Sequence, residues 1–531
     1  MPLEDSFVDK LCSVDQAIDL IKNFDTVNLV ASGGGFQDAD LVYKGLEKRF
    51  LETGEPNNLT LVHVTGVGSG NETGLGRLAH KGLVKRVIGG HWLWSKVMGQ
   101  LALDEEIEAY NLPQGVLALL MREIAAGRPG LLTTVGLNTF MDPRLEGGRM
   151  NKRAEESLIE LLDFQGKEML LYKSFPIDVC IVRGTTADED GNISVEMEGL
   201  DLHILSAAQA TYNSGGVVIA QVKRLAKKGT LNPRMVRVPA HMVNAVVLCP
   251  DQWQSAECEY NPALCGEVRV PMDSMPSLDF GIRKFIARRA ALELKPGAVV
   301  NLGIGIPDGI ANIAAEEGII DDFVFSIEMG VVGGVPAKGV IFGAAWNPDC
   351  IMSMPTQFDF YHGGGLDMAF LGMGEADESG NVNVSKLGKR ITGSGGFIDI
   401  SQNAKTMVFC GTFMNGETVL DIKDGKVVIV QEGAKRKFKK QVEQITFSGE
   451  YSARTGQNVL YVTERAVFKL EDGKMVLIEI APGIDVEKDI LANMDFSPGI
   501  SPDLKAMDPS IFMPETIMET NPGLFHYFAE R

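Results

Sequence analysis

One short sequence occurs twice in this chain, and the duplication limits the folds that the chain can adopt. Residues 187–195 read ADEDGNISV and residues 376–384 read ADESGNVNV, so six of nine positions agree. Upstream of these copies, residues 13–36 and 277–307 each give an amphipathic helix, an apolar strand and a glycine-rich turn. Matches in the same order indicate duplication of a whole structural unit. We therefore expect two related halves with a cleft between them.

The length and charge of the chain argue against several classes of protein. Its 531 residues exceed what one hydrophobic core usually supports. A net charge of −20 argues against broad binding to nucleic acid or anionic membranes, because either would need an extended basic surface. One anionic ligand in a local pocket remains compatible with this charge. The N-terminus lacks the features of a secretory leader, and no apolar run is long enough to span a membrane, so we predict a cytoplasmic protein.

Cysteine and histidine give no pattern of a metal site. The seven cysteines include no CxxC pair, which favours reduced thiols over a disulfide framework. The seven histidines form no HExxH motif or other close pair. We therefore predict neither a bound metal nor metal catalysis.

The order of apolar and helical segments predicts an α/β fold. Short apolar runs at 27–31, 59–64 and 84–88 alternate with helical patterns such as 41–51 and 114–124. This alternation is typical of a mainly parallel sheet with helices on its faces. The second half repeats the pattern, so we predict two homologous α/β halves with the active site in the cleft between them.

The boundary between the halves is predicted from composition. Residues 237–279 are rich in proline, methionine, cysteine and aromatic residues and look like a linker or crossover. This gives an N-terminal α-like domain over residues 1–236 and a C-terminal β-like domain over residues 280–531. The glycine turn and the repeated motif lie much farther apart in the first half, which indicates an insertion around residues 72–149.

A glycine-rich turn in the second half is a candidate anion cradle. Residues 303–307 read GIGIP and stand between a predicted strand and a predicted helix, so their amides can face a ligand at a helix N-terminus. The alternative is a tight turn in which glycine only relieves steric strain. The dinucleotide fingerprint GxGxxG is incomplete here, because Asp308 stands where its third glycine should be. Dinucleotide binding is therefore not supported.

One glutamate stands in an apolar segment that only the second half contains. Glu328 lies in FSIEMGVVGG, at the end of a predicted strand and among apolar neighbours. A carboxylate in such a setting must be hydrogen-bonded, paired or functional. From these residues alone, a structural ion pair and a catalytic group remain equally open.

Nine ordered motifs make the chain resemble a known family over nearly its whole length. It resembles the family I coenzyme A transferases, and most closely the fused single-chain acetate and propionate CoA-transferases. The motifs are ASGGGF (31–36), DPRLEGG (142–148), ADEDGN (187–192), NLGIGIP (301–307), SIEMGVVGG (326–334), QFDFYHGGGLD (357–367), ADESGN (376–381), GSGGFIDIS (393–401) and TERAVF (463–468).

The resemblance implies a role for the central glutamate. In this family the glutamate of the Ser/Thr-x-Glu-x-Gly segment is the nucleophile, and Glu328 occupies that position. It attacks an acyl-CoA and becomes a glutamyl-CoA thioester, and an incoming acid reverses the sequence in a ping-pong reaction. Family members commonly have asparagine, serine or threonine after this glutamate, where this chain has Met329.

Further site residues are implied by the same resemblance. The backbone amides of two glycine loops are candidate oxyanion donors and CoA contacts: Gly303, Ile304, Gly305, Ile306, Gly395 and Gly396. The acid pocket is assigned to Gly33, Gly34, Gly35 and Phe36, and His362 to orienting the substrate carboxylate, with plain turn structure as the alternative. Lys386 and Arg390 are candidates for the CoA phosphates, although surface cations are more often just solvated.

The resemblance also implies partners. Coenzyme A and acyl-CoA are expected as substrates rather than as permanently bound cofactors, with short-chain carboxylic acids as the other substrates. A homo-oligomer, a dimer or tetramer, is expected.

Two other functions would use the same cleft. An acyl-CoA hydrolase would admit water to the adduct and release acid without an acceptor, whereas a non-catalytic acyl-CoA-binding protein would not need Glu328. We predict the short-chain acyl-CoA:carboxylate CoA-transferase.

Overall fold

The computed structural model describes residues 10–271, 277–423, 425–525 and 528. The chain forms two compact units, and both are discontinuous in sequence. The first comprises Met1–Val270, Ile327–Asp359 and Lys389–Asp399, and the second comprises Pro271–Ser326, Phe360–Gly388 and Ile400–Arg531. Glu328 therefore belongs to the first unit, although it follows a strand of the second.

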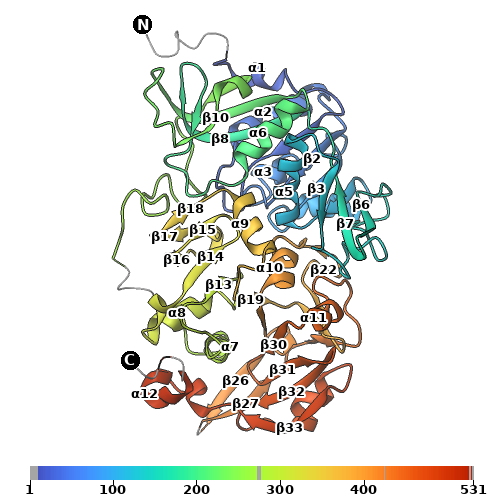
Figure 1. Cartoon of the computed structure of the whole chain (residues 1–531), viewed down its shortest axis with the longest axis vertical. Helices are drawn as coiled ribbons and strands as arrows, with labels where there is room; N and C mark the ends of the chain where they lie inside the picture. The colour runs from blue at the N-terminus through green and yellow to red at the C-terminus, as the bar shows by residue number, and fades with distance from the viewer. Residues whose placement is uncertain (1–9, 272–276, 424, 526–527, 529–531) are drawn as a thin grey trace. The chain divides into compact units, whose positions relative to one another are not determined.

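Seven parallel strands form the sheet of the first unit, in the order β4-β3-β2-β1-β8-β10-β12. Strands β2, β3, β8 and β10 of this sheet are labelled in Figure 1. All ten residues of β8 are buried, as expected for a strand that is covered on both faces. The strands are β1 (Thr26–Leu29), β2 (Leu59–His63), β3 (Val84–Gly89), β4 (Glu108–Asn111), β8 (Val179–Asp188), β10 (Val217–Ala226) and β12 (Ala245–Leu248), with β9 (Ile193–Ser194) and β11 (Val236–Val238) added antiparallel.

Helices of the first unit begin and end at recognisable residues. A capping box of Ser13 and Gln16 begins α1, α5 follows Pro113, and Gly54 ends α2 in the left-handed conformation. The helices are α1 (Val14–Ile18), α2 (Asp40–Thr53), α3 (Gly74–Arg77), α4 (Lys96–Leu103), α5 (Gln114–Ala125), α6 (Ile204–Asn213) and η2 (Ala240–Met242). A separate antiparallel sheet contains β5 (Gly130–Thr133), β6 (Ile159–Phe164) and β7 (Lys167–Lys173).

Two segments from the second half of the sequence complete the first unit. The first segment contains β15 (Val331–Val332), β16 (Val335–Pro336), η4 (Gly339–Ile341), β17 (Ala345–Trp346), β18 (Cys350–Ile351) and the start of α9 (Met354–His362). The second contains β23 (Arg390–Ile391) and the start of α10 (Phe397–Asn403).

The second unit repeats the parallel sheet and extends it by three strands, of which only β31 runs antiparallel to its neighbours. The order β14-β13-β19-β24-β30 is parallel, and β31, β32 and β33 follow. These strands are β13 (Val299–Leu302), β14 (Val324–Ile327), β19 (Met368–Gly372), β24 (Thr406–Cys410), β30 (Asn458–Val462), β31 (Ala466–Glu471), β32 (Lys474–Ile480) and β33 (Gly499–Ala506).

Short ladders and helices surround this second sheet. The short strands are β20 (Glu375–Asp377), β21 (Val382–Asn383), β22 (Lys386–Leu387), β25 (Met414–Asn415), β26 (Val419–Lys423), β27 (Lys426–Gln431), β28 (Lys435–Arg436) and β29 (Phe438–Lys439). The helices are α7 (Ile282–Ala291), α8 (Gly309–Glu316), η3 (Ile320–Asp322), α11 (Gly449–Thr455), η5 (Val486–Ile490), η6 (Leu491–Asn493), η7 (Pro509–Phe512), α12 (Ile517–Thr520) and η8 (Pro522–Phe525).

The registers of the two sheets show the duplication residue by residue. Val27 pairs with Leu61 and Val179, and Val179 pairs with Val217. In the same way Val300 pairs with Phe325 and Met368, and Met368 pairs with Thr406. The predicted α/β fold of two related halves is therefore confirmed.

The halves differ most in the length of chain that separates two paired strands. These strands are β1 and β8 in the first half and β13 and β19 in the second. Val27 and Val179 are 152 positions apart, whereas Val300 and Met368 are only 68 apart. Strands β3 and β4 and the sheet β5-β7-β6 lie within the longer interval, which includes the predicted insertion at residues 72–149.

The predicted division at residues 237–279 differs from the compact units. Strand β12 lies inside this segment and pairs with β10, so the segment is more than a linker, and the first unit extends to Val270. Residues 272–276 of the segment lie outside the described residues. The homologous domains 1–236 and 280–531 stay a prediction. Their boundaries differ from those of the two compact units.

The described part of the chain contains neither a membrane-spanning helix nor a metal-binding cluster. None of their helices is both long enough and apolar enough to cross a bilayer. Across residues 10–271, 277–423 and 425–525, His, Cys, Asp and Glu side chains form no group of three suited to a metal ion.

Candidate active site

Glu328 directly follows β14, at the carboxyl end of a parallel strand. Open α/β sheets place their ligands at this edge. The residue is only 8% exposed, and its neighbours Ile327 and Met329 are also buried. The sequence folds this way locally because the buried strand ends at Ile327 and Gly330 then turns the chain with a φ of 102°. The result is a nearly buried carboxylate on a turn.

Met329 holds the glutamate segment against the first half. Its Sδ lies 3.8 Å from Ser32 Oγ and 3.5 Å from Gln114 Nε2, both of which donate to it. Sulfur accepts hydrogen bonds weakly, so the contact is mainly packing with a polar component. The difference from the polar residue common in the family thus has a structural role: Met329, the residue after Glu328, is held against Ser32.

The first glycine turn begins at the residue after Ser32. Gly34 has a φ of 79°, and a Cβ there would lie 2.0 Å from the carbonyl oxygen of Val340, so only glycine fits. The backbone N–H of Ser32 donates to the carbonyl of Phe36 at 2.8 Å and closes the turn. Phe36 itself is fully buried, and its place in the acid pocket stays a prediction. Gly33, Gly34 and Gly35 remain candidates for the acid pocket.

The GSGGF loop at residues 393–397 is fixed by first-half residues. The N–H of Gly395 donates to the carbonyl of Gly90 at 2.8 Å, and the carbonyl of Gly395 accepts from the N–H of Gln114 at 2.9 Å. The Ser394 N–H donates to Asn111 Oδ1 at 2.8 Å. The Gly395 amide is therefore already hydrogen-bonded in this structure, and its role as an oxyanion donor stays a prediction. Within the described ranges, no hydrogen bond involves the Gly396 amide.

The GIGIP loop lies in the second unit, and two of its four backbone N–H groups already donate hydrogen bonds within the protein. The N–H of Gly303 donates to the carbonyl of Phe370 at 2.8 Å, which continues the ladder of the sheet. The N–H of Gly305 donates to Asp308 Oδ2 at 2.9 Å, and Arg283 contacts the other oxygen of the same carboxylate. The Gly303 and Gly305 amides are thus already hydrogen-bonded, and their role as donors stays a prediction. Ile304 and Ile306 stay candidates, and the Ile304 side chain is 48% exposed.

Sequence reasoning missed the segment His91–Trp92–Leu93–Trp94, which follows β3. Burial lowers the pKa of His91 to about 4, with further lowering from the nearby His63 and Arg390. Burial also lowers the pKa of His63 to about 4, although the carbonyl of Thr65, 2.6 Å from Nδ1, opposes the shift. Both imidazoles are therefore neutral near pH 7. An aromatic segment directly after a strand and two glycines was the available signal.

Gln114, also missed, contacts two methionine sulfurs. Its Nε2 lies 3.5 Å from Met329 Sδ and 3.8 Å from Met354 Sδ, and its side chain is buried. It begins α5 after Pro113. Its backbone contacts Gly395 and its side chain contacts Met329, so it touches both second-half segments that complete the first unit. Its sequence context PQG carries no motif that would have singled it out.

The comparisons with known proteins agree with this geometry. The family model for coenzyme A transferase matches residues 13–248. A caffeate CoA-transferase of Acetobacterium woodii is 48% identical over 95% of this chain and 97% of its own length. The chain belongs to the coenzyme A transferase family. The acetate CoA-transferase YdiF of Escherichia coli K12 is 44% identical over 94% of each chain. A crystal structure of YdiF from E. coli O157:H7, a thioester complex with CoA, superposes with a TM-score of 0.91, at 42% identity over 97% of this chain and 98% of that one.

For three predicted site residues of this CoA-transferase, the structure gives a position but no evidence of a role. His362 ends α9 in the second unit and is half-buried, and Lys386 in β22 of the same unit is also half-buried. Arg390 is exposed on β23 of the first unit. The roles of these side chains toward the substrate and the CoA phosphates stay predictions.

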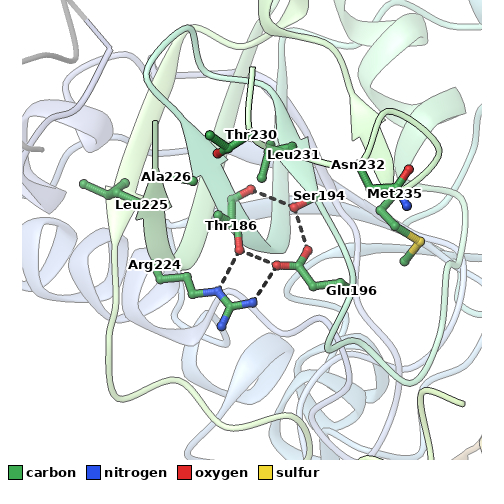
Figure 2. Close-up of a pocket in the computed structure, with 10 residues that line it drawn as sticks. All are labelled: Thr186, Ser194, Glu196, Arg224, Leu225, Ala226, Thr230, Leu231, Asn232 and Met235. Carbon is green, nitrogen blue, oxygen red and sulfur yellow. Dashed lines mark hydrogen bonds and ion pairs between the residues drawn. The ribbon is translucent and has the colours of Figure 1, made fainter. Parts of the chain in front are cut away.

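The first unit of the transferase also has a cavity of about 290 Å³ (Figure 2). Glu196 accepts hydrogen bonds there from Ser194 Oγ at 2.6 Å, from Arg224 Nη2 at 2.9 Å, and from Thr186. These charges compensate one another, so we assign the cavity no chemistry. It is lined by Thr186, Ser194, Glu196, Arg224, Leu225, Ala226, Thr230, Leu231, Asn232 and Met235.

Proposed function

We propose that this CoA-transferase exchanges CoA between short-chain carboxylic acids through a thioester on Glu328. The observation that carries the proposal is a nearly buried carboxylate on a strand-end turn, anchored by Met329 beside the first glycine turn. Relatives named for acetate and caffeate, together with the YdiF thioester complex with CoA, support the same chemistry.

The reaction balances without a metal or a nucleotide. A Glu328 oxygen attacks the acyl carbonyl, the C–S bond breaks, and CoA thiolate leaves behind a mixed anhydride. The thiolate then attacks the glutamyl carbonyl and expels the first acid as its carboxylate, which leaves glutamyl-CoA. An incoming carboxylate follows the same steps in reverse. Because one thioester is exchanged for another, the overall reaction is nearly thermoneutral.

Each tetrahedral intermediate of this sequence carries an oxyanion that needs donors. We assign this role to the amides of Ile304, Ile306 and Gly396, because the amides of Gly303, Gly305 and Gly395 are already bonded. A well-placed donor of this kind stabilises the transition state by about 2.7 to 4 kcal/mol.

Exclusion of water favours transfer over hydrolysis. The glutamyl thioester would be lost to any water activated beside it. Glu328 is 8% exposed, and both its chain neighbours are apolar and buried. The hydrolase therefore stays the second candidate, and acid release from acyl-CoA in the absence of an acceptor would distinguish it.

Chemical trapping tests the proposal. The enzyme is incubated with acetyl-CoA and reduced with borohydride, and the peptide spanning residues 326–334 is mapped by mass spectrometry. We expect Glu328 to be converted to its alcohol only after exposure to acyl-CoA. Glu328→Gln should give no adduct, whereas the exposed Glu378→Gln should behave as wild type. Full turnover without a label at this position would reject Glu328 as the nucleophile.

We also propose that the enzyme works in the cytoplasm as a homo-oligomer, on the strength of the family resemblance. Light scattering coupled to size exclusion tests the oligomer, and a purely monomeric active enzyme would contradict it.

A further inference from the structure

The segment His91–Trp94 lies across the ends of the first three strands of its sheet. A Cβ added to Gly33, after β1, would lie 2.1 Å from Trp94 Nε1. A Cβ added to Gly66, after β2, would lie 2.1 Å from Trp94 Cδ1. The indole therefore rests directly on the backbone of both turns. Glycine is required at these two positions because the ring occupies the space of a side chain.

The same segment contacts the GSGGF loop on its other side. The N–H of Trp92 donates to the carbonyl of Thr392 at 2.8 Å. A Cβ at Gly393 would lie 2.9 Å from Trp92 Cδ1, and one at Gly395 would lie 3.2 Å from His91 Cδ2. One short segment thus touches the glycine turn assigned to the acid and the glycine loop assigned to the oxyanion.

Its two tryptophans differ in exposure. Trp92 is 1% exposed and packs as a core residue, whereas Trp94 is half-buried. Part of the Trp94 side chain is therefore accessible, although its Nε1 and Cδ1 atoms lie against the turns at Gly33 and Gly66. Ser32, the residue before Gly33, contacts Met329, the residue after Glu328. The ring consequently stands on the same strand end to which the nucleophile segment is anchored.

We infer that Trp94 is a specificity-determining residue: its indole forms a wall of the acid pocket and restricts the enzyme to short-chain aliphatic acids. The inference rests on the proposed function, because it concerns the acid that Glu328 exchanges. The ring is fixed from beneath by two backbone turns, so it cannot move aside for a longer acid without leaving both contacts. Discrimination in an apolar pocket is roughly 10- to 200-fold per methylene, so loss of this wall has a measurable effect.

Acceptor profiles test the wall. The kcat/KM values of wild type, Trp94→Phe and Trp94→Ala are measured with acetate, butyrate, hexanoate and cinnamate, against one acyl-CoA donor. We expect Trp94→Ala to raise the hexanoate-to-acetate ratio at least tenfold, with Trp94→Phe in between. The control is Trp253→Ala, whose indole is 52% exposed elsewhere on this unit, and its ratio should be unchanged. An unchanged ratio in Trp94→Ala would overturn the inference, and so would a selective loss of cinnamate, which would show that the indole stacks on aromatic acids.

A second pair of variants tests the packing on which the wall depends. Gly66→Ala places a methyl group where the Trp94 ring lies, so we expect it to lower kcat/KM for acetate at least tenfold. Gly66→Ala combined with Trp94→Leu should recover most of that loss, because the smaller side chain vacates the space. Absence of recovery in a folded double variant would contradict the placement of the ring.

The borohydride trap separates this inference from the proposed function. Unlabelled Glu328 in an active wild-type enzyme would reject the proposed function, whatever the acceptor profile. Labelled Glu328 with a flat profile across the Trp94 variants would reject only the role of Trp94.

Discussion

The two halves of the transferase build the same strand ends and use them differently. Asn28 and Asn301 occupy equivalent buried positions in β1 and β13. Asp178 accepts from the N–H of Thr26 at 2.8 Å, and Asp367 accepts from the N–H of Val299 at 3.0 Å. The scaffold is thus preserved to the level of single hydrogen bonds.

The halves differ in chemistry just after the second strand of each sheet, β2 in the first half and β14 in the second. Leu61 and Phe325 are equivalent by register, so the position three residues later is Val64 in the first half and Glu328 in the second. Val64 is fully buried, and its carbonyl oxygen would lie 1.9 Å from a Cβ at Gly90. In the first half this position is a buried core residue, and in the second half it carries the carboxylate. The comparison teaches that the fold supplies the position and that a single side chain supplies the chemistry.

The largest expected effect comes from removing the chemistry. Glu328→Gln keeps the shape of the side chain but removes its nucleophilic oxygen, so kcat should fall at least about a thousandfold. Steady-state exchange assays measure it, with Glu378→Gln as the matched control. The preparation must be checked for deamidation, and a variant that exchanges acids at the wild-type rate would break the comparison.

The reciprocal change at the equivalent position should damage stability instead. Val64→Glu places an unpaired carboxylate in a fully buried site, which we expect to lower the free energy of unfolding by about 3 kcal/mol or more. Urea titration measures this loss, and Val64→Ile serves as the apolar control. The double variant Val64→Glu, Glu328→Gln should stay inactive. Restored exchange in that variant would show that the halves are interchangeable.

The residue before each of these positions also differs, as His63 and Ile327. The folded-state pKa of His63 lies at about 4, below the 6.5 of an unfolded chain. A depressed histidine pKa contributes stability above pH 6.5 that is lost as pH falls toward 4, at about 1.4 kcal/mol per pH unit. The melting temperature of the wild type should therefore fall as the pH is lowered from 6.5 to 4. In His63→Ile the melting temperature should depend less steeply on pH. Parallel curves for the two proteins would contradict a neutral buried His63.

The smallest effect tests the equivalence of the scaffolds. Asp178→Asn and Asp367→Asn each weaken one hydrogen bond to a strand N–H, and each should cost about 1 kcal/mol. Asp367→Asn also removes the exposed ion pair of Asp367 with Lys405, which contributes little to stability. Urea unfolding measures both losses, which should agree within about 0.5 kcal/mol. A large loss in only one variant would show that the shared contact does not do the same work in both halves.

Local pattern predicted the strands and the duplication well. The predicted strand 59–64 is β2 (Leu59–His63), and the predicted strand 84–88 is β3 (Val84–Gly89), because buried parallel strands read as short apolar runs. The position of Glu328 at a strand end followed from the same reasoning. These features depend on residues that are close together in sequence.

Long-range packing was beyond the sequence. The union of residues 327–359 with the first unit depends on contacts such as Ser32 with Met329, nearly 300 positions away. The hydrogen bond of the Gly395 amide depends on the Gly90 carbonyl, and the role of Trp94 depends on two glycines in other turns. No local periodicity encodes such pairs, and a glycine-rich motif does not tell which of its amides are already bonded.

An oxygen isotope follows the central claim most directly. In the proposed sequence, an incoming carboxylate forms a mixed anhydride with Glu328, and the bridging oxygen stays on the glutamate when CoA thiolate takes the acyl group. Turnover with ¹⁸O-acetate and acetyl-CoA should therefore place ¹⁸O in the Glu328 carboxyl, as read from the peptide 326–334. Turnover with no isotope at this position would contradict the account.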